Sequence, residues 1–422
     1  MTPLTSISTG AQGSILFQGA VGAAPIHVKT VTGQTFNNPI VLGVDVIFES
    51  LGQLPPAPLA QGDITFNGAI NGGFNLTVNT AGVTNFNGPM GAVTTLASVT
   101  TDAGGRVQFG GTGTVTTLSG DNFTGTYVRT TGAQAYNDTV TLVANTMLES
   151  SNAGNLTFGS TVDGGFDLKL NTAGVTVFNA PVGLTAPLMS ITTDAQGSTQ
   201  LNAGTVKTIA AQAFNDPVTL LKDTTLASTA LGDVSFNNKL DGAFALTVNT
   251  GGKTSFNNQV GATAALTSIT TDAAGTVQFQ DTAPVAAGVT PLITVKTSGA
   301  QIYNDQALLA SDTTFAGGAD VIFNNKIDGA FNMTVNTGGQ TQFNDQVGAT
   351  ARLKTITTDA PGTVRFKDSV GTTTGGVTTF AIKIYTTGAQ TFRDKVILVN
   401  DATFDTTKDV ATGANITFGD TI

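Results

Sequence analysis

The sequence contains no cysteine and no tryptophan, and His27 is its only histidine. Without cysteine there is no disulfide framework and no thiolate chemistry. Charged residues make up only 11% of the 422 residues, and of the 28 acidic residues only Glu49 and Glu149 are glutamates. This shortage of helix-favouring Glu, Lys and Arg argues against a mainly helical protein. The net charge of −10 disfavours nucleic acid as a partner, because nucleic-acid-binding proteins need a basic surface.

Long apolar runs are also missing. No segment approaches the roughly 20 apolar residues that span a bilayer, and the N-terminus lacks the basic and apolar regions of a signal peptide. The abundant residues are Gly, Thr, Val, Asn and Asp, which favour strands and turns. Because 40% of the chain is hydrophobic, it can bury a core and is not expected to be disordered. Composition therefore predicts an all-β protein.

The chain is a long tandem repeat. A segment that reads Leu-x-(Ser/Thr)-(Ile/Val)-x-Thr begins at Leu4, Leu96, Leu188, Leu266 and Leu353, with starts 92, 92, 78 and 87 residues apart. The 422 residues therefore hold about four and a half long repeats. Such internal repetition indicates an array of stacked units rather than a set of unrelated domains.

Each long repeat contains a shorter period. An aromatic residue, usually followed by small polar residues, returns mostly every 20 to 24 residues, and Leu201 fills the matching position once. The aromatic positions are Phe17, Phe36, Phe66, Phe86, Phe109, Tyr136, Phe158, Phe178, Phe214, Phe236, Phe256, Phe279, Tyr303, Phe323, Phe343, Phe366, Phe392 and Phe418. Around them apolar residues alternate, as in Val234-Ser-Phe236, which is typical of strands with one buried face.

A unit of about 22 residues is too short for a propeller blade and fits one coil of a β-solenoid. Stacked coils would align equivalent side chains, so we expect an internal aromatic stack and a polar ladder at the corner that follows it. The spacing predicts about 19 coils of roughly 20–24 residues and a rod of roughly 90 Å. Antiparallel hairpin modules are the alternative, because Asp-Gly pairs at 163, 241 and 328 are also hairpin signals.

We expect one continuous solenoid over residues 1–422, interrupted by loops at 51–61, 110–130, 281–298 and 368–386. The first of these stretches contains three prolines, and the last two precede a Gly-Ala-Gln sequence. Both ends of the chain fall inside a repeat, and no polar cap is visible there. Because an open solenoid end exposes strand edges, we expect flanking repeats of a longer chain or end-to-end stacking of copies.

Catalytic chemistry finds little support in the sequence. His27 lies in a strand-like run, and a nucleophilic triad or a zinc site would need more partners than this chain offers. Asp102, Asp194, Asp272 and Asp359 occupy one repeat position and would lie roughly 19 Å apart, which is too far for glycoside cleavage. We therefore predict no enzyme activity, no catalytic residues and no cofactor site, and we expect most of the aspartates to be turn residues.

Two other kinds of site were considered. The position two residues after the aromatic carries carboxylates in successive units near the C-terminus, at Asp345, Asp368, Asp394 and Asp420. Carboxylates on neighbouring coils are candidate ligands for Ca²⁺. The Thr pairs at 100–101, 192–193, 270–271 and 357–358 return only once per long repeat, which predicts that no flat array of threonines forms.

Some of the repeats resemble a known group. The motif Gly-Ala-Gln-x-(Phe/Tyr)-Asn-Asp occurs at 132–138 and 299–305, and at 388–394 with Arg393 in place of Asn. With the Phe-Asn-Asn and Asp-Gly-x-Phe-x-Leu-x-Val-Asn-Thr segments, it resembles the repeats of large bacterial filamentous-haemagglutinin-like and autotransporter-type exoproteins. The resemblance implies a right-handed parallel β-helix, secretion, and a role as an adhesin shaft or surface fibre.

We therefore expect a structural, non-enzymatic, extracellular rod or fibre segment of a large bacterial surface adhesin. Its partners would be copies of itself or flanking repeats, and host or matrix glycans are a further candidate. The alternatives are a β-helix that binds or cleaves carbohydrate with its long loops, and a subunit of a self-assembling filament.

Overall fold

The computed structural model describes residues 3–20, 22–51, 62–284, 290–374, 377–407 and 412–422. These residues form 51 short strands and no helix, and the parallel strands stack as a β-solenoid of about 17 turns. The chain divides into two compact units, Met1–Ile209 and Ala210–Ile422, which are described one at a time. Continuity of the solenoid from one unit to the other stays a prediction.

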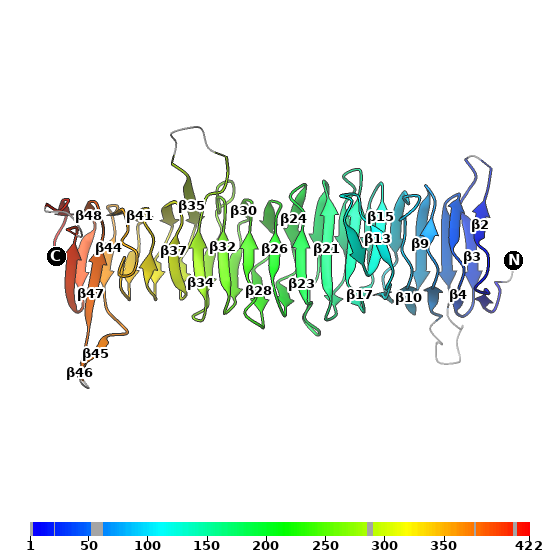
Figure 1. Cartoon of the computed structure of the whole chain (residues 1–422), viewed down its shortest axis with the longest axis horizontal. Coiled ribbons are helices and arrows are strands. Elements are labelled where there is room, and N and C mark those ends of the chain that lie inside the picture. The colour runs from blue at the N-terminus through cyan, green and yellow to red at the C-terminus, as the bar shows by residue number, and fades with distance from the viewer. Residues whose placement is uncertain (1–2, 21, 52–61, 285–289, 375–376, 408–411) are drawn as a thin grey trace. The chain divides into compact units, whose positions relative to one another are not determined.

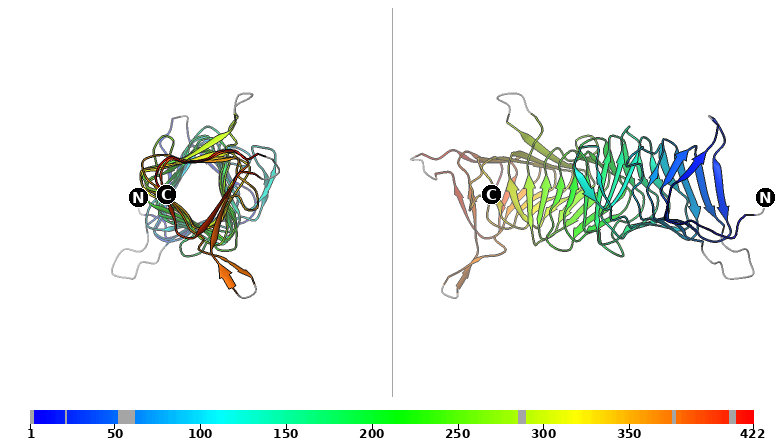
Figure 2. Two further views of the ribbon diagram at one scale, coloured as in Figure 1. Left: turned by 90° about the vertical axis from the view of Figure 1, so that its left-hand side faces the viewer. Right: turned by 45° about the vertical axis from the view of Figure 1, so that its right-hand side comes forward.

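In the first unit each coil contributes one strand to each of three parallel sheets, named faces A, B and C, which surround the core (Figures 1 and 2). Face A contains β1 (Ile7–Ser8), β4 (Gln34–Phe36), β7 (Ile64–Phe66), β10 (Val83–Phe86), β12 (Arg106–Phe109), β17 (Thr139–Leu142), β20 (Val162–Asp163) and, through a bridge at Val182, β25 (Thr205–Thr208). Face B contains β2 (Ile15–Gln18), β5 (Ile40–Gly43), β8 (Ile70–Asn71) and, through a bridge at Met90, β15 (Thr126–Thr130), β18 (Thr146–Ser150), β21 (Asp167–Thr172) and β23 (Ser190–Thr193). Face C contains β3 (Ile26–Thr30), β6 (Val46–Ser50), β9 (Asn75–Thr80), β11 (Ser98–Thr101), β16 (Gln134–Tyr136), β19 (Leu156–Phe158), β22 (Val175–Phe178) and β24 (Ser198–Leu201).

The second unit repeats this arrangement with faces D, E and F. Face D contains β26 (Gln212–Phe214), β29 (Val234–Phe236), β32 (Lys253–Phe256), β34 (Thr276–Phe279), β37 (Gln306–Leu309), β40 (Ile327–Asp328) and, through a bridge at Val347, β47 (Ala381–Tyr385) and β50 (Asp401–Asp405). Face E contains β27 (Val218–Leu220), β30 (Leu240–Asp241) and, through a bridge at Val260, β35 (Leu292–Thr297), β38 (Asp312–Gly317), β41 (Asn332–Thr337), β43 (Thr355–Thr358), β48 (Gln390–Phe392) and β51 (Ile416–Phe418). Face F contains β28 (Thr224–Ser228), β31 (Ala245–Asn249), β33 (Ser268–Thr271), β36 (Gln301–Tyr303), β39 (Val321–Phe323), β42 (Gln340–Phe343), β44 (Thr363–Phe366) and β49 (Lys395–Leu398).

The core consists of side chains that alternate inward along each strand. In β29, for example, Val234 and Phe236 are buried and Ser235 points outward. The predicted aromatic stack is present: Phe236 and Phe256 stack with ring centroids 5.5 Å apart, as do Phe66 and Phe86. Burial of such rings supplies much of the hydrophobic stabilisation of each coil.

The aromatic stack differs from the prediction because it is not one continuous column. In the first unit it runs up face A from Phe36 to Phe109 and then continues on face C from Tyr136, while Phe17 lies on face B and packs against Phe48. The rings of Phe109 and Tyr136 meet edge to face, at 88°, whereas neighbouring rings of the stack on one face lie nearly parallel. In the second unit the same change of face occurs between Phe279 and Tyr303 and again between Phe366 and Phe392. We call each such position a junction.

Junctions explain why about 17 turns are present instead of about 19. From Phe109 on face A the chain passes face B and reaches Tyr136 on face C, so the aromatic position advances by two strands instead of three. Counting aromatic positions therefore overestimates the number of coils. The same shift makes a long repeat shorter than the four coils expected, so equivalent residues of successive repeats lie on different faces.

Excursions from the solenoid are shorter than the predicted loops. The C-terminal parts of 110–130, 281–298 and 368–386 form the solenoid strands β15, β35 and β47. Two of the excursions contain antiparallel hairpins, β13 (Thr114–Thr116) with β14 (Asn122–Thr124), and β45 (Thr372–Thr374) with β46 (Val377–Thr379). Most of the predicted loop at 51–61 lies outside the described residues.

The expected polar ladder is also present at the corners. Asn67 Nδ2 donates to Asn37 Oδ1 over 2.7 Å, and Asn87 Nδ2 donates to Asn67 Oδ1 over 2.8 Å. In the second unit Asn257, Asn237 and Asn215 form an equivalent chain. Each amide therefore links one coil to the next.

Candidate functional site

The hairpin β13–β14 covers the outer side of face B in the first unit. Val128 and Leu148 point into the solenoid, so their neighbours Tyr127 and Met147 point outward. Phe123 of the hairpin packs on Tyr127 and Met147 and forms a small second core with them. Here the outer surface of a sheet is buried, which gives this region an environment unlike that of the ordinary solenoid surface.

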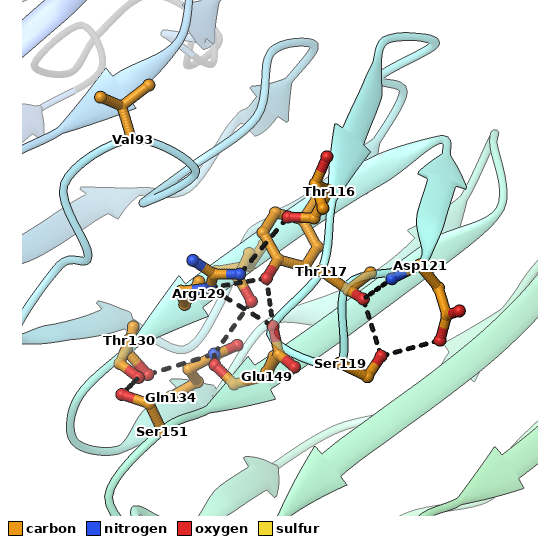
Figure 3. Close-up of polar contacts among 12 residues, drawn as sticks. Val93, Thr116, Thr117, Ser119, Asp121, Arg129, Thr130, Gln134, Glu149 and Ser151 are labelled. Atoms are coloured by element: carbon orange, nitrogen blue, oxygen red, sulfur yellow. Dashed lines mark hydrogen bonds and ion pairs between the residues drawn. The ribbon is translucent and has the colours of Figure 1, made fainter.

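Arg129 and Glu149 form an ion pair beside this second core (Figure 3). Arg129 Nε lies 3.4 Å from Glu149 Oε2 and donates a 2.6 Å hydrogen bond to the hydroxyl oxygen of Tyr127, which itself donates to Glu149. Burial and the neighbouring carboxylate raise the pKa of Tyr127 above its usual range. Arg129 also reaches the Thr116 carbonyl of the hairpin over 3.4 Å, so the cluster fastens the hairpin to face B.

The chain's only two glutamates occupy equivalent positions in this arrangement. Lys29 and Glu49 pair over 3.1 Å in the first long repeat, but their side chains are 44% and 24% exposed, against 13% and 5% for Arg129 and Glu149. Since exposed pairs contribute little to stability, the hairpin converts a surface pair into a buried one. Sequence reasoning missed this cluster, although Tyr127, an aromatic residue outside the repeated position, was a signal.

A cleft of about 310 Å³ opens beside the hairpin turn, and the side chains that line it are mostly polar. Leu118 and Ser119 form one wall, and the corner residues of three successive coils form the other, among them Glu149, Asn171 and Asp194. Asp194 accepts a 3.1 Å hydrogen bond from the Thr172 amide, and burial raises the pKa of its carboxyl group. Hydroxyl, amide and carboxylate groups of this kind can hydrogen-bond a polyol.

The four predicted calcium ligands lie at two different corners. Asp345 and Asp368 follow face F in successive coils, whereas Asp394 and Asp420 follow face E, because a junction separates the two pairs. Asp368 accepts hydrogen bonds from the amides of Gly371 (2.7 Å) and Ala381 (3.1 Å). In the part of the chain that the structure describes, no three His, Asp or Glu side chains group as a metal site would require. The four residues together therefore do not form the expected ladder.

A small cavity of about 160 Å³ adjoins Asp345 and Asp368. Lys326 and Lys383 also line it, so positive charge accompanies the two carboxylates. Burial raises the pKa of Asp345, the positive charge of Lys326 lowers it, and the carboxylate of Asp368 raises it further. This mixed charge favours neither a cation nor an anion.

Other aspartates act between coils, as expected of turn residues. Asp241 Oδ1 accepts hydrogen bonds from the amides of Thr263 (2.8 Å) and Ala264 (3.0 Å), which belong to the following coil. Asp163 and Asp328 hold the equivalent amides of their own repeats. His27 lies on the exposed side of β3, in register with Ile47.

The sequence predicted that no flat array of threonines forms, and the second unit contains a single column of them. On face E the outward positions of six strands in register are all threonines, namely Thr294, Thr314, Thr334, Thr357, Thr391 and Thr417. They come from different segments of the long repeat, which is why the spacing of Thr pairs did not reveal them. The column is one residue wide: Lys296 lies two residues after Thr294 on β35, and Arg393 directly follows β48.

No protein-family model matches the chain, and no curated protein or solved structure matches it. In the described ranges no helix is long and apolar enough to cross a membrane. The resemblance to filamentous-haemagglutinin-like exoproteins thus stays a prediction from the repeats.

Proposed function

We propose that this chain is a structural, non-enzymatic segment of a large extracellular fibre or adhesin of a bacterial surface. The observation that carries the proposal is the use of the polar side chains. Asn67, Asp241 and their equivalents in other repeats hydrogen-bond the neighbouring coil. These amide and carboxylate groups, which could bind a ligand or act as catalysts in another protein, here link one coil to the next, as expected of a shaft.

Mechanical resistance follows from this arrangement. Each coil contacts only its neighbours, so load applied along the stack is borne by successive interfaces of parallel strand hydrogen bonds and stacked rings. A cysteine-free sequence also suits export of an unfolded chain through an oxidising compartment, where stray disulfides would block passage. The partners would then be flanking repeats or further copies of the chain.

Single-molecule pulling between the two termini tests the proposed role. We expect a series of partial unfolding steps, each releasing one or a few coils, because stability in a stacked array is local. One all-or-none rupture of the whole chain would contradict a shaft built from separable coils. Incubation with a panel of polysaccharides should release no reducing ends, and any release would contradict the non-enzymatic assignment.

Carbohydrate binding is a second candidate, favoured by the polar cleft beside Ser119 and Asn171. Glycan-array binding by the purified chain would support it, provided that Asn171→Ala abolishes the signal. Asn249 occupies the equivalent position in the second unit and is exposed, so Asn249→Ala is the matched control. Binding that survives Asn171→Ala would exclude this cleft.

A further inference from the structure

A buried carboxyl group lies at the junction of the first unit. Asn137 and Asp138 form a tight turn between β16 and β17, stacked on the wider turn 102–105 of the preceding coil. Asp138 is 1% exposed, and its Oδ1 accepts a 2.7 Å hydrogen bond from the Gly105 amide. Its Oδ2 is buried and has no hydrogen-bond partner among the described residues.

The second unit contains the same corner at Asp305 and at Asp394. Asp305 is 1% exposed and accepts a 2.8 Å hydrogen bond from the Gly275 amide, while its Oδ2 is buried without a partner in the described ranges. Asp394 is 2% exposed, and neither of its carboxyl oxygens has a hydrogen-bond partner in the same ranges. All three residues are the Asp of the Gly-Ala-Gln-x-(Phe/Tyr)-x-Asp motif, so the feature recurs with the junctions.

The surroundings of these carboxyl groups are acidic or neutral. The preceding coil presents a second aspartate in each case, Asp102, Asp272 or Asp359, and a threonine hydroxyl, Thr101, Thr271 or Thr358. The following coil presents Ser160, Asn325 or Asp420. The nearest cations in sequence, Arg106, Arg393 and Lys395, are exposed, and no ion pair of the described residues includes the three carboxylates.

Burial without a compensating cation disfavours the charged form of a carboxyl group. Burial raises the pKa of Asp138, Asp305 and Asp394 to about 6 each, and the nearby aspartate adds to the rise. Hydrogen bonds from the amides of Gly105 and Gly275 lower the pKa of the first two, and the neighbouring threonine hydroxyl lowers the pKa at all three sites, but burial outweighs both. A cleft lined by Gly82, Gly105, Arg106 and Thr139 adjoins the turn that contains Asp138.

We propose that Asp138, Asp305 and Asp394 are proton-binding sites at the junctions, and that they make the solenoid more stable in mild acid than at neutral pH. Each carboxyl group would be charged and uncompensated at neutral pH. A proton bound to the free oxygen removes that charge and supplies a donor that the buried threonine hydroxyl can accept. Acidification would therefore tighten the contact between the two coils that meet at each junction.

The direction follows from linkage. A carboxyl group whose pKa is raised in the folded state binds its proton more tightly there than in the unfolded chain, so it contributes stability at low pH that is lost as pH rises through about 6. Compared with the ordinary value of about 3.8, each site would raise the folding equilibrium constant about tenfold between pH 7.5 and pH 5. Ordinary acid denaturation has the opposite sign in this window.

The test compares a His27→Gln parent with the same protein carrying Asp138→Asn, Asp305→Asn and Asp394→Asn. The sole histidine is removed because histidine titrates in the same pH window. Between pH 7.5 and 5 each of the three carboxyl groups should bind about 0.9 proton. The folded parent should therefore take up about two to three protons more than the triple variant. The melting temperature of the parent should rise over this range, and that of the triple variant should stay nearly constant at the higher value.

Asp401→Asn is the control, because Asp401 is an exposed aspartate of β50 and belongs to none of the three corners. It should leave the pH profile of the parent unchanged. If the triple variant does not fold, the single variants replace it, each with a loss of about one proton. Equal proton uptake by parent and variants would overturn the proposal. So would a parent melting temperature that Ca²⁺ raises at pH 7.5, with no such rise in the triple variant, because the corners would then be cation sites.

Discussion

At the scale of single residues, one hydroxyl group decides whether a buried glutamine has all its hydrogen bonds. The glutamine concerned lies two residues before the aromatic residue that follows each junction. Gln134 Nε2 donates to the Glu149 carbonyl of the next coil (3.0 Å) and to Thr130 Oγ1 (3.2 Å), and Tyr136 donates to Gln134 Oε1 over 2.9 Å. Gln390 makes the equivalent amide contacts, but a phenylalanine, Phe392, stands in place of the tyrosine. Gln390 Oε1 is consequently buried without a partner among the described residues.

We expect Phe392→Tyr to stabilise the second unit by about 1 kcal/mol, because the new hydroxyl would satisfy this oxygen. The reverse change, Tyr136→Phe, should destabilise the first unit by about 1–3 kcal/mol, since it leaves Gln134 Oε1 buried and unsatisfied. Urea unfolding followed by circular dichroism measures both. Phe366→Tyr is the control: Val364, not Gln, lies two residues before this ring, so its hydroxyl should only destabilise.

Glycine is required in the Asn/Asp-Gly turn that each long repeat contains. Gly242 has φ +130°, and a Cβ at this position would lie 2.3 Å from the Leu220 carbonyl oxygen of the preceding coil. We expect Gly242→Ala to cost about 1–3 kcal/mol through backbone strain and this clash. Gly338→Ala, at a glycine with open space around it, should change the unfolding midpoint little. Equal midpoints for the two variants would show that the turn tolerates a side chain.

At the scale of elements, the hairpin β13–β14 depends on very few contacts. Its apolar contact with face B is Phe123 on Tyr127 and Met147, with Val115 packed against the same cluster. In the second unit Phe380, just after the hairpin β45–β46, is 45% exposed. The comparison indicates that an excursion folds onto the solenoid only where the outward side chains of the coil offer an apolar surface.

We therefore expect Phe123→Ala to release the first hairpin while the solenoid stays folded. Limited proteolysis should cut the variant within residues 113–125 and leave the coils resistant, because locally unstable segments are cleaved first. Phe380→Ala should leave the cleavage pattern near β45–β46 unchanged. A variant as resistant as the parent would show that Val115 and the Arg129 contact with the Thr116 carbonyl suffice to hold the hairpin.

Stacked coils and aromatic ladders could be predicted from the sequence, because the regular spacing of one residue type indicates them even when the course of the chain between those residues is unknown. The change of face could not. Phe279 to Tyr303 spans 24 residues, the length of an ordinary coil, but covers only two strands and an excursion. The Tyr127–Glu149 cluster was equally hidden, because it needs a hairpin whose docking depends on contacts between segments far apart in sequence.

At the scale of the whole molecule, the long repeat is the unit that can be removed while each remaining strand still meets an equivalent strand of the preceding coil. Leu353 and Leu266 open equivalent segments, and in the second unit those segments form β43 and β33. Asp272 accepts the Thr250 amide over 3.0 Å, and Asp359 accepts the equivalent Thr337 amide over 3.0 Å. After deletion of residues 266–352, Asp359 could therefore take the place of Asp272 on the same preceding coil.

We expect the chain that lacks residues 266–352 to fold with a melting temperature within a few degrees of the parent, since nearest-neighbour contacts are preserved. Deletion of residues 274–352 is the control. It keeps β33 and joins it directly to the segment of β43, so one strand position too many remains and Phe366 falls on the wrong face. The Phe366 ring would then face smaller side chains, and such a mismatch in a packed core lowers the free energy of unfolding by several kcal/mol. Equal thermal stability of the two deletions would mean that coils stack without regard to face, and the junctions would then have no structural role.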